Sequence, residues 1–192
     1  MYRSFLSALF CLVLLSLFIS GCAREPQWKA FSPTDGSFTV SLPDTPKENS
    51  ITLSMHEMAQ AMNVRDEPVM NGMTYTLTQK ERAFMVAYID IPDAVSSKVP
   101  EDRINDLVLR GILQDRMGCN PTAQKEATLG GKKAAEFTFE GPGALVSLAG
   151  KGIARSCYYN KRVYIALSIL PLPLFEDRKS TIEKFLSSFT VK

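Results

Sequence analysis

The run from Val163 to Leu170 constrains the fold of this chain more than any other segment, because Ser168 is its one polar residue. A turn at Asn160 and Lys161 precedes it, and Pro171 and Pro173 end it. A continuous apolar run of this length between turn signals is typical of a buried strand. We therefore expect a sheet with this segment as a central strand.

The other apolar segments show strand or helix periodicity. We expect strands at 38–42, 73–77, 84–89, 123–129, 134–140 and in the stretch that ends at Tyr159, a helix from Pro100 to about Met117, and a final helix near 174–187. The order is strands, helix, strands, helix, and the connections are of hairpin length. This order predicts a single α+β domain over residues 28–192, an antiparallel β-sheet with helices packed on it.

The stretch from Ser50 to Val69 fits two patterns. Ile51, Leu53 and Met55 alternate as in a strand. Ile51, Met55, Met58 and Met62 also stand at helical spacing, so both interpretations remain open here.

The first 21 residues have the three parts of an export signal. Arg3 is followed by a mainly apolar run from Phe5 to Ile19, then by Ser20, Gly21 and Cys22. At about 1.5 Å per residue the run is roughly 22 Å long in a helix. That is shorter than the roughly 30 Å hydrocarbon core of a bilayer, so a cleaved signal peptide fits better than a permanent span. Cleavage is expected between Gly21 and Cys22.

The tetrapeptide from Ile19 to Cys22 resembles the lipobox of bacterial lipoproteins: a branched apolar residue, two small residues, then cysteine. The resemblance implies a lipidated Cys22 that anchors the protein to the membrane, with residues 22–27 as a tether. In that pattern an aspartate after the cysteine retains the protein at the inner membrane. Ala23 and Arg24 follow here, which implies the periplasmic face of the outer membrane if the cell is Gram-negative.

The composition after cleavage is that of an ordinary globular domain. Of 192 residues 171 remain, with 21 Lys and Arg against 20 Asp and Glu. That length suits one domain with a proper core. A near-neutral balance creates no general field for nucleic acid, and export makes nucleic acid an implausible partner.

Two groups of motifs resemble PsbP-like envelope lipoproteins. The opening is Trp28-x-x-Phe31-Ser32-x-x-Asp35-Gly36-x-Phe38-x-Val40-x-Leu42-Pro43-x-x-Pro46, and the later motifs are Leu129-Gly130-Gly131-Lys132, Glu136-Phe137, Arg155, Arg162-Val163-Tyr164 and Phe185-Leu186-Ser187-Ser188-Phe189. The resemblance implies an α/β/α sandwich around an antiparallel sheet. Because similar proteins mostly act as assembly factors or remain uncharacterised, it implies no catalytic residues and little chemistry.

The sequence offers little for catalysis. His56 is the only histidine, and no serine lies in a Gly-x-Ser-x-Gly motif. The acidic residues from Asp90 to Asp106 are explained more simply by a solvent-exposed turn and by the first turns of a helix. We expect a protein that is not an enzyme and carries no cofactor.

Methionines make a soft-metal site one alternative. Met55, His56, Met58 and Met62 resemble a copper(I) motif, because thioether sulfur suits a soft ion. The competing interpretation is that the same spacing buries methionines in a core or an apolar groove.

The two remaining cysteines, Cys119 and Cys157, suggest a disulfide, as expected for an exported pair. If the three strands after the first helix form a meander, however, the two residues lie at opposite ends of the sheet, about 20 Å apart. A disulfide needs Cα atoms within about 7 Å. Free thiols are therefore favoured, unless the strand order differs.

The leading hypothesis is a non-enzymatic envelope lipoprotein that binds another envelope protein or assists complex assembly. Its contact residues are predicted to be Met55, Met58 and Met62, together with Leu145 and Val146 in the loop 141–148. Copper binding through the methionine segment is the first alternative. A carrier of a small apolar ligand, bound between sheet and helix, is the second.

Overall fold

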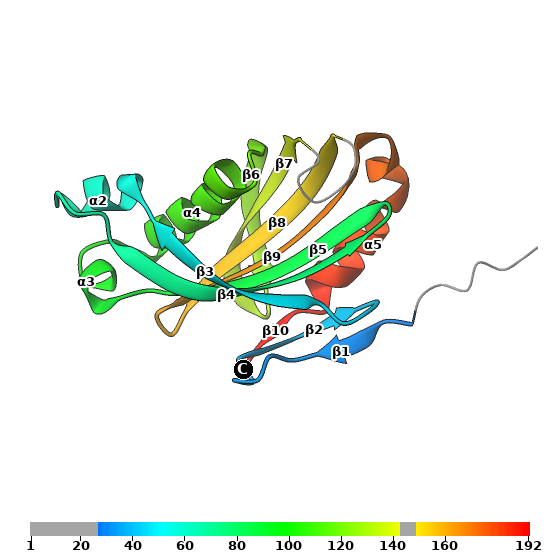
Figure 1. Ribbon diagram of the computed structural model, residues 1–192, viewed down its shortest axis with the longest axis horizontal. Helices are drawn as coiled ribbons and strands as arrows, with labels where there is room; N and C mark the ends of the chain where they lie inside the picture. Colours follow the sequence, from blue (N-terminus) through cyan, green and yellow to red (C-terminus); the bar gives the residue numbers. More distant parts are fainter. Residues whose placement is uncertain (1–26, 143–148) are drawn as a thin grey trace, which may run out of the picture.

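Two antiparallel sheets form the framework of the computed structural model, which describes residues 27–142 and 149–192 (Figure 1). The larger sheet has seven strands: β3 (Lys47–Ser54), β4 (Val69–Gln79), β5 (Arg82–Asp90), β6 (Asn120–Leu129), β7 (Lys132–Gly141), β8 (Gly150–Tyr159) and β9 (Arg162–Pro171). Their spatial order is β3-β4-β5-β9-β8-β7-β6. The smaller sheet, ordered β1-β2-β10, consists of β1 (Lys29–Phe31), β2 (Phe38–Leu42) and β10 (Thr190–Val191).

Helices cover both faces of the large sheet (Figure 1). One face carries α2 (His56–Met62), α3 (Asp93–Ser96) and α4 (Glu101–Gly111), the last continued by a π-helical turn at Ile112–Arg116. The other face carries α5 (Phe175–Ser187), preceded by a 3-10 turn at Leu172–Leu174, and the small sheet. The predicted α+β fold, an antiparallel sheet with helices packed on it, is confirmed.

Strand β9 lies at the centre of the large sheet, between β5 and β8. Every residue from Val163 to Leu170 is buried. Successive side chains of a strand point to opposite faces. Accordingly Ile165 and Leu167 enter the core on the α4 side, while Ala166 and Leu170 enter the core on the α5 side. The predicted central strand is confirmed.

The core on the α4 side is mainly aliphatic. Helix α4 contributes Ile104, Leu107 and Val108, which point onto β8 and β9. Acidic residues in the first turn, Glu101 and Asp102, suit the positive end of the helix dipole. Further along, Gly118 adopts a φ of 63°, a conformation that glycine accepts without strain and that ends the helical segment as expected.

The core on the α5 side is rich in aromatic rings. Phe38 of β2 stacks on Phe189 with ring centroids 5.3 Å apart, and Phe84 of β5 packs on Phe185 of α5 at 5.1 Å. Strand β10, the last strand of the chain, pairs antiparallel with β2. The alternation at 38–42 predicts β2 correctly, but not that β2 belongs to a separate sheet.

The ambiguous stretch 50–69 contains both of the predicted structures. Strand β3 extends to Ser54, so the alternation of Ile51 and Leu53 is that of a strand. Helix α2 then begins at His56 with Met55 as its N-cap, and Asn63, in the left-handed conformation at φ 55°, ends it.

Cys119 and Cys157 do not form the disulfide that their export suggested: both are free and buried. Cys119 lies in the α4-side core, where a Cβ on Gly141 would meet its Sγ at 2.5 Å, whereas Cys157 lies in the α5-side core. Strands β6, β7, β8 and β9 do form a meander, which separates the two residues as anticipated. Burial raises the pKa of Cys119 and raises the pKa of Cys157 to about 12, although Lys132 opposes the latter shift.

One buried carboxylate ties α5 to the sheet. Glu136 of β7 has a side chain only 3% exposed and accepts hydrogen bonds from Arg155 Nε at 2.7 Å and Lys125 Nζ at 2.9 Å. Arg155 in turn donates through Nη2 to Glu183 of α5 at 2.8 Å. Burial alone would raise the pKa of Glu136, but the two cationic partners outweigh it and hold that pKa below its usual value.

We predict that both thiols resist alkylation until the protein unfolds. In the processed chain carrying Cys22→Ser, iodoacetamide should modify neither residue under native conditions, because burial removes access and disfavours the reactive thiolate. In guanidinium chloride without reductant it should modify both, as counted by mass spectrometry. Two thiols that become reactive only after reduction would show that a disulfide exists.

We also predict that Glu136 makes stability depend on acid pH. A carboxyl group whose folded pKa is lowered contributes stability above its unfolded pKa, near 4.5, and loses that contribution as the pH falls through the folded value. Glu136→Gln should therefore destabilise the protein by about 2 kcal/mol at pH 7, and by progressively less below pH 4.5. Urea unfolding between pH 3 and pH 7 measures both effects.

The matched control is Glu126→Gln, because Glu126 forms a surface pair with Lys133 in which both side chains are more than 80% exposed. Its expected effect is below about 0.5 kcal/mol at every pH. Equal effects of the two substitutions would contradict the role given to Glu136.

Candidate functional site

The predicted methionine site is largely part of the core. Met55 is 5% exposed and Met58 is 0% exposed, and both belong to the α4-side core. A Cβ on Gly111 of α4 would lie 2.7 Å from Met55 Cε, so the glycine makes room for this methionine. The prediction that Met55 and Met58 contact a partner is therefore wrong, because neither reaches the surface. Met62 is half-buried against the same core.

His56 lies apart from this packing. Its side chain is 72% exposed, with Nδ1 at 3.4 Å from Glu67 Oε1 and Nε2 at 3.0 Å from Gln60 Nε2. The imidazole thus faces solvent while the sulfurs of Met55 and Met58 face the core. Such an arrangement favours the packing interpretation of the methionines over a shared copper(I) site.

Within residues 27–142 and 149–192, no three His, Cys, Asp or Glu side chains are grouped so as to hold a metal ion. The one histidine is exposed, whereas Cys119 and Cys157 are buried, so these residues do not form a Cys–His pair.

Several predicted site residues lie outside the described residues. They are Gly21 and Cys22 of the processing site and Leu145 and Val146 of the loop 141–148. In the part of the chain that the structure does describe, no helix is both long and apolar enough to cross a membrane.

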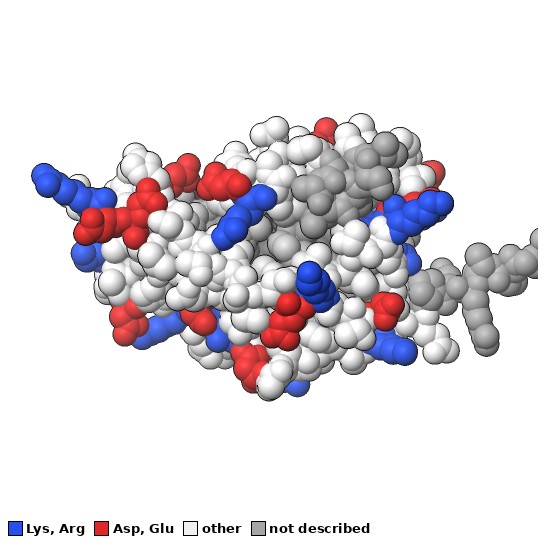
Figure 2. All heavy atoms as spheres, in the orientation of Figure 1, with Lys and Arg blue, Asp and Glu red and all other residues white. Residues whose placement is uncertain are grey.

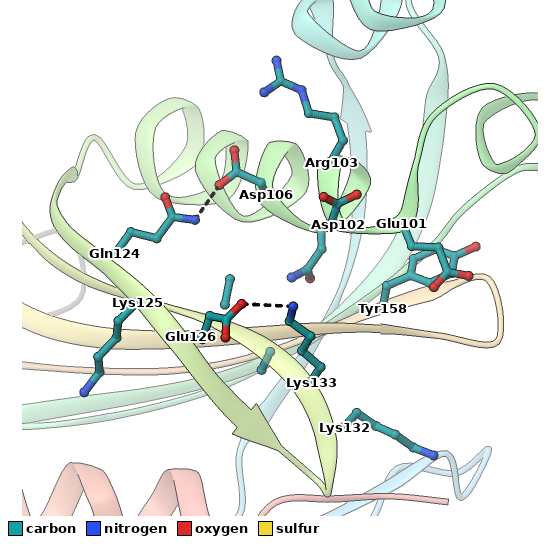
Figure 3. A pocket seen from close by; sticks show the side chains of 13 residues that line it. Glu101, Asp102, Arg103, Asp106, Gln124, Lys125, Glu126, Lys132, Lys133 and Tyr158 are labelled. Carbon is teal, nitrogen blue, oxygen red and sulfur yellow. Dashed lines mark hydrogen bonds and ion pairs between the residues drawn. The ribbon is translucent and has the colours of Figure 1, made fainter.

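A cleft of about 700 Å³ opens between α4 and the β6–β7 hairpin (Figure 3). We call it the α4 cleft. Its lining comes from the first turns of α4, from both strands of the hairpin and from β8: Glu101, Asp102, Arg103, Asn105, Asp106, Gln124, Lys125, Glu126, Lys132, Lys133, Ala134, Ala135 and Tyr158. Its size is within the usual range for small-molecule sites, about 300–1,000 Å³.

Charged side chains on the rim of the α4 cleft pair with neighbours. Asp106 accepts from Arg110 Nε at 3.0 Å and from Gln124 Nε2 at 3.3 Å, which links the helix to β6. Glu126 and Lys133 form an ion pair across the hairpin at 3.0 Å. Figure 3 shows the Asp106–Gln124 and Glu126–Lys133 contacts on opposite sides of the opening.

Asn105 lies deeper in the α4 cleft and is only 7% exposed. Its Nδ2 donates to the backbone carbonyl of Ser156 on β8 at 3.0 Å. The other amide atom, Oδ1, is buried without a hydrogen-bond partner among the described residues, and so is the Ser156 hydroxyl. Asn105 is therefore a buried polar residue in the lining of the cleft, beside an α4-side core that is apolar.

Sequence reasoning missed this cleft, because it assigned the acids of α4 to a solvated helix start. One signal was available. Asn105 stands three residues before Val108 and next to Ile104, which puts a polar side chain at the margin of the apolar stripe.

The surface carries both signs of charge. On the face drawn in Figure 2, Lys and Arg side chains are interspersed with Asp and Glu, and neither sign forms a continuous patch. This agrees with the near-neutral composition, 22 Lys and Arg against 20 Asp and Glu in the whole chain.

Comparisons with known proteins find similarity of structure but not of sequence. No protein-family model matches the chain, and no curated protein matches it significantly. The solution structure of cyanobacterial PsbP (CyanoP) from Synechocystis sp. PCC 6803 matches with a TM-score of 0.53 at 12% identity, covering 90% of this chain and 96% of that one.

Two other solved structures overlap less well. LpqN, involved in cell envelope biogenesis of Mycobacterium tuberculosis, has a TM-score of 0.45 at 10% identity, covering 86% of this chain and 91% of its own. PA94 of Pseudomonas aeruginosa, a protein of unknown function, has a TM-score of 0.40 at 8% identity, covering 82% and 92%. At such low identity the likeness to CyanoP concerns architecture alone: the chain has a PsbP-like fold.

Proposed function

We propose that the chain is a lipid-anchored, non-enzymatic protein of the bacterial cell envelope that binds another envelope protein. The observation that carries the proposal is the lipobox-like sequence ending at Cys22, which stands directly in front of a domain with a PsbP-like fold. Each acyl chain on the cysteine contributes about 0.8 kcal/mol per buried methylene, so several chains hold a protein at the membrane essentially permanently. Ala23 and Arg24 favour the outer membrane in a Gram-negative cell.

The placement of the elements supports a partner surface at the end of the domain opposite to β1. The described chain enters the domain at β1, and α2 projects from the opposite end of the long axis (Figure 1). At that end Val69, the first residue of β4, is 56% exposed, the highest value among the large hydrophobic side chains of the described residues. Met62, at the end of α2, is half-buried. We propose the α2–β4 segment, residues 62–69, as part of the contact surface for an envelope protein that offers a complementary apolar side chain.

The two alternatives have less structural support. Copper(I) binding needs Met55 and Met58 to leave the core and meet His56, which faces solvent. A carrier of apolar ligands needs an apolar cavity between sheet and helix. The α4 cleft is instead lined mostly by charged and amide side chains.

We predict that Cys22→Ser releases the protein from the membrane. The unaltered protein should incorporate radiolabelled palmitate and sediment with outer membranes, whereas the variant should do neither. Cys119→Ala is the matched control and should keep both properties, because Cys119 is buried in the core. Equal membrane recovery of all three proteins without label would remove the anchor from the proposal.

We further predict that the α2–β4 segment contacts a specific envelope protein. A photo-crosslinking amino acid at Val69 should capture one defined partner in cells. The same amino acid at Lys179, exposed on α5, should not. Val69→Lys should abolish the capture while leaving the unfolding temperature within about 2 °C, because substitutions at exposed sites rarely change stability. Capture at both positions, or at neither, would contradict the proposed surface.

A further inference from the structure

Trp28 lies where the described chain enters the domain, next to two basic side chains. Its indole packs edge-on against Phe84 of β5, with ring centroids 5.5 Å apart, and Lys184 Nζ of α5 lies 5.0 Å from the centroid of the Trp28 ring. Arg82 Cζ lies over the Phe84 ring at 5.7 Å. An aromatic pair with a basic side chain at each ring therefore marks the entry to the domain.

These two basic side chains are available to bind anions. Among the described residues neither Arg82 nor Lys184 forms an ion pair. The neighbouring Arg178 is engaged, because it donates to Glu81 Oε2 at 2.6 Å. Burial and repulsion from Arg178 lower the pKa of Arg82. An anion beside Arg82 would therefore relieve a repulsion that the described residues leave in place.

Exposed apolar surface lies at the same end of the domain. The start of β1, the turn between β4 and β5 and the 3-10 turn Leu172–Leu174 all lie at the end of the long axis where the described chain enters (Figure 1). Leu172 is 49% exposed, which is unusual for a large hydrophobic side chain of the described residues. We call Trp28, Arg82, Leu172 and Lys184 together the Trp28 end.

The number of residues before the domain limits how far the Trp28 end can stand from an anchored cysteine. Gln27 is the fifth residue after Cys22, and a chain spans at most about 3.6 Å per residue, so the two residues lie within about 18 Å of each other. Tryptophan favours the interface between a membrane and water, where its ring is in apolar surroundings and its N–H finds a partner. Arginine and lysine bind phosphate oxygens through charge-assisted hydrogen bonds.

The charge at this end acts only at short range. The segments that meet here, residues 27–31, 43–47, 79–82 and 172–184, hold seven basic and five acidic residues. So small an excess does not attract an anionic surface from a distance, because salt screens exposed charges beyond about 8 Å. A short tether removes this difficulty, since it keeps lipid headgroups close to Arg82 and Lys184.

We propose that the Trp28 end docks on an anionic membrane surface and thereby sets the orientation of the domain. Trp28 and Leu172 lie at the level of the headgroups, and Arg82 and Lys184 bind lipid phosphate groups. The α2–β4 segment, at the opposite end of the long axis, then points away from the membrane. The inference rests on the proposed lipid anchor, because the contacts of this end are too few to hold the protein without it.

Trp28 is the only tryptophan of the chain, so its fluorescence reports on this end alone. The processed, lipidated protein is reconstituted on vesicles of phosphatidylcholine, or of a two-to-one mixture of phosphatidylcholine and phosphatidylglycerol. Acrylamide, an uncharged quencher, should quench Trp28 about two to three times less strongly on the mixed vesicles, because headgroups cover the indole only when the end docks. The tether is the same on both lipids, so its length does not affect the comparison.

Paired charge reversals locate the docking surface. Arg82→Glu combined with Lys184→Glu should abolish the difference between the lipids, because each basic residue near an anionic surface strengthens binding about fivefold. The matched control combines Arg65→Glu with Lys98→Glu, which changes the net charge equally at exposed positions near α2 and α3, and it should keep the difference. Lys184→Glu alone, at an exposed position, should reduce the difference and remains informative if Arg82→Glu unfolds the domain.

Two results would overturn the docking. One is equal quenching of Trp28 on both lipids, and the other is an equal loss of the lipid difference in the two paired variants. Flotation with phosphatidylcholine vesicles reports on the anchor separately. A protein that does not float with them would overturn the proposed anchor, and docking would then stand only if flotation with the mixed vesicles requires Arg82 and Lys184.

Discussion

Burial of β9 on both faces is the constraint from which the other layers follow. A strand that is apolar on both sides needs cover on both sides, since each large side chain left in water forfeits roughly 1.5–3 kcal/mol. Helix α4 supplies one cover over β8 and β9, and α5 supplies the other. The α5-side cover is completed by β2, whose Phe38 packs against Phe189 near the end of the chain. Covering the α5 side of this one central strand therefore brings β2, near the start of the described residues, into contact with Phe189, near their end.

The same arrangement explains where the α4 cleft lies. Helix α4 packs on β8 and β9, near the middle of the sheet, so the edge hairpin of β6 and β7 extends beyond it. β6 is an edge strand with mostly exposed residues, and it has an irregularity between Pro121 and Ala123. Such features limit further strand pairing at an edge. The space between helix and hairpin is consequently bridged by polar contacts such as Asp106 with Gln124 rather than filled by apolar side chains.

Which structural features the sequence predicts depends on how far apart in the chain the interacting residues lie. Alternation at 38–42, the helical stripe after Pro100 and the Gly130–Gly131 turn predict elements correctly, because each pattern spans enough residues to fix a period. The pairing of β10 with β2 was not predictable, because β10 has only two residues. Spacing left strand and helix open for Met55, which is the extended N-cap of α2, and it could not say that Met55 meets Gly111 of α4. The α4 cleft depends on contacts between residues about 20 to 50 positions apart, which no local pattern encodes.

Asn105 is the residue whose presence packing alone does not explain. Replacing a buried amide and its partner by apolar groups of similar shape is often neutral or stabilising, whereas each buried polar atom without a partner costs about 1–3 kcal/mol. Here Nδ2 is satisfied by Ser156, while Oδ1 and the Ser156 hydroxyl are not satisfied by any described residue. A leucine at position 105 would extend the stripe of Ile104 and Val108 and remove this cost. The amide is therefore kept at a cost in stability, and the contact that it provides is the hydrogen bond from Nδ2 to the Ser156 carbonyl, which joins α4 to β8.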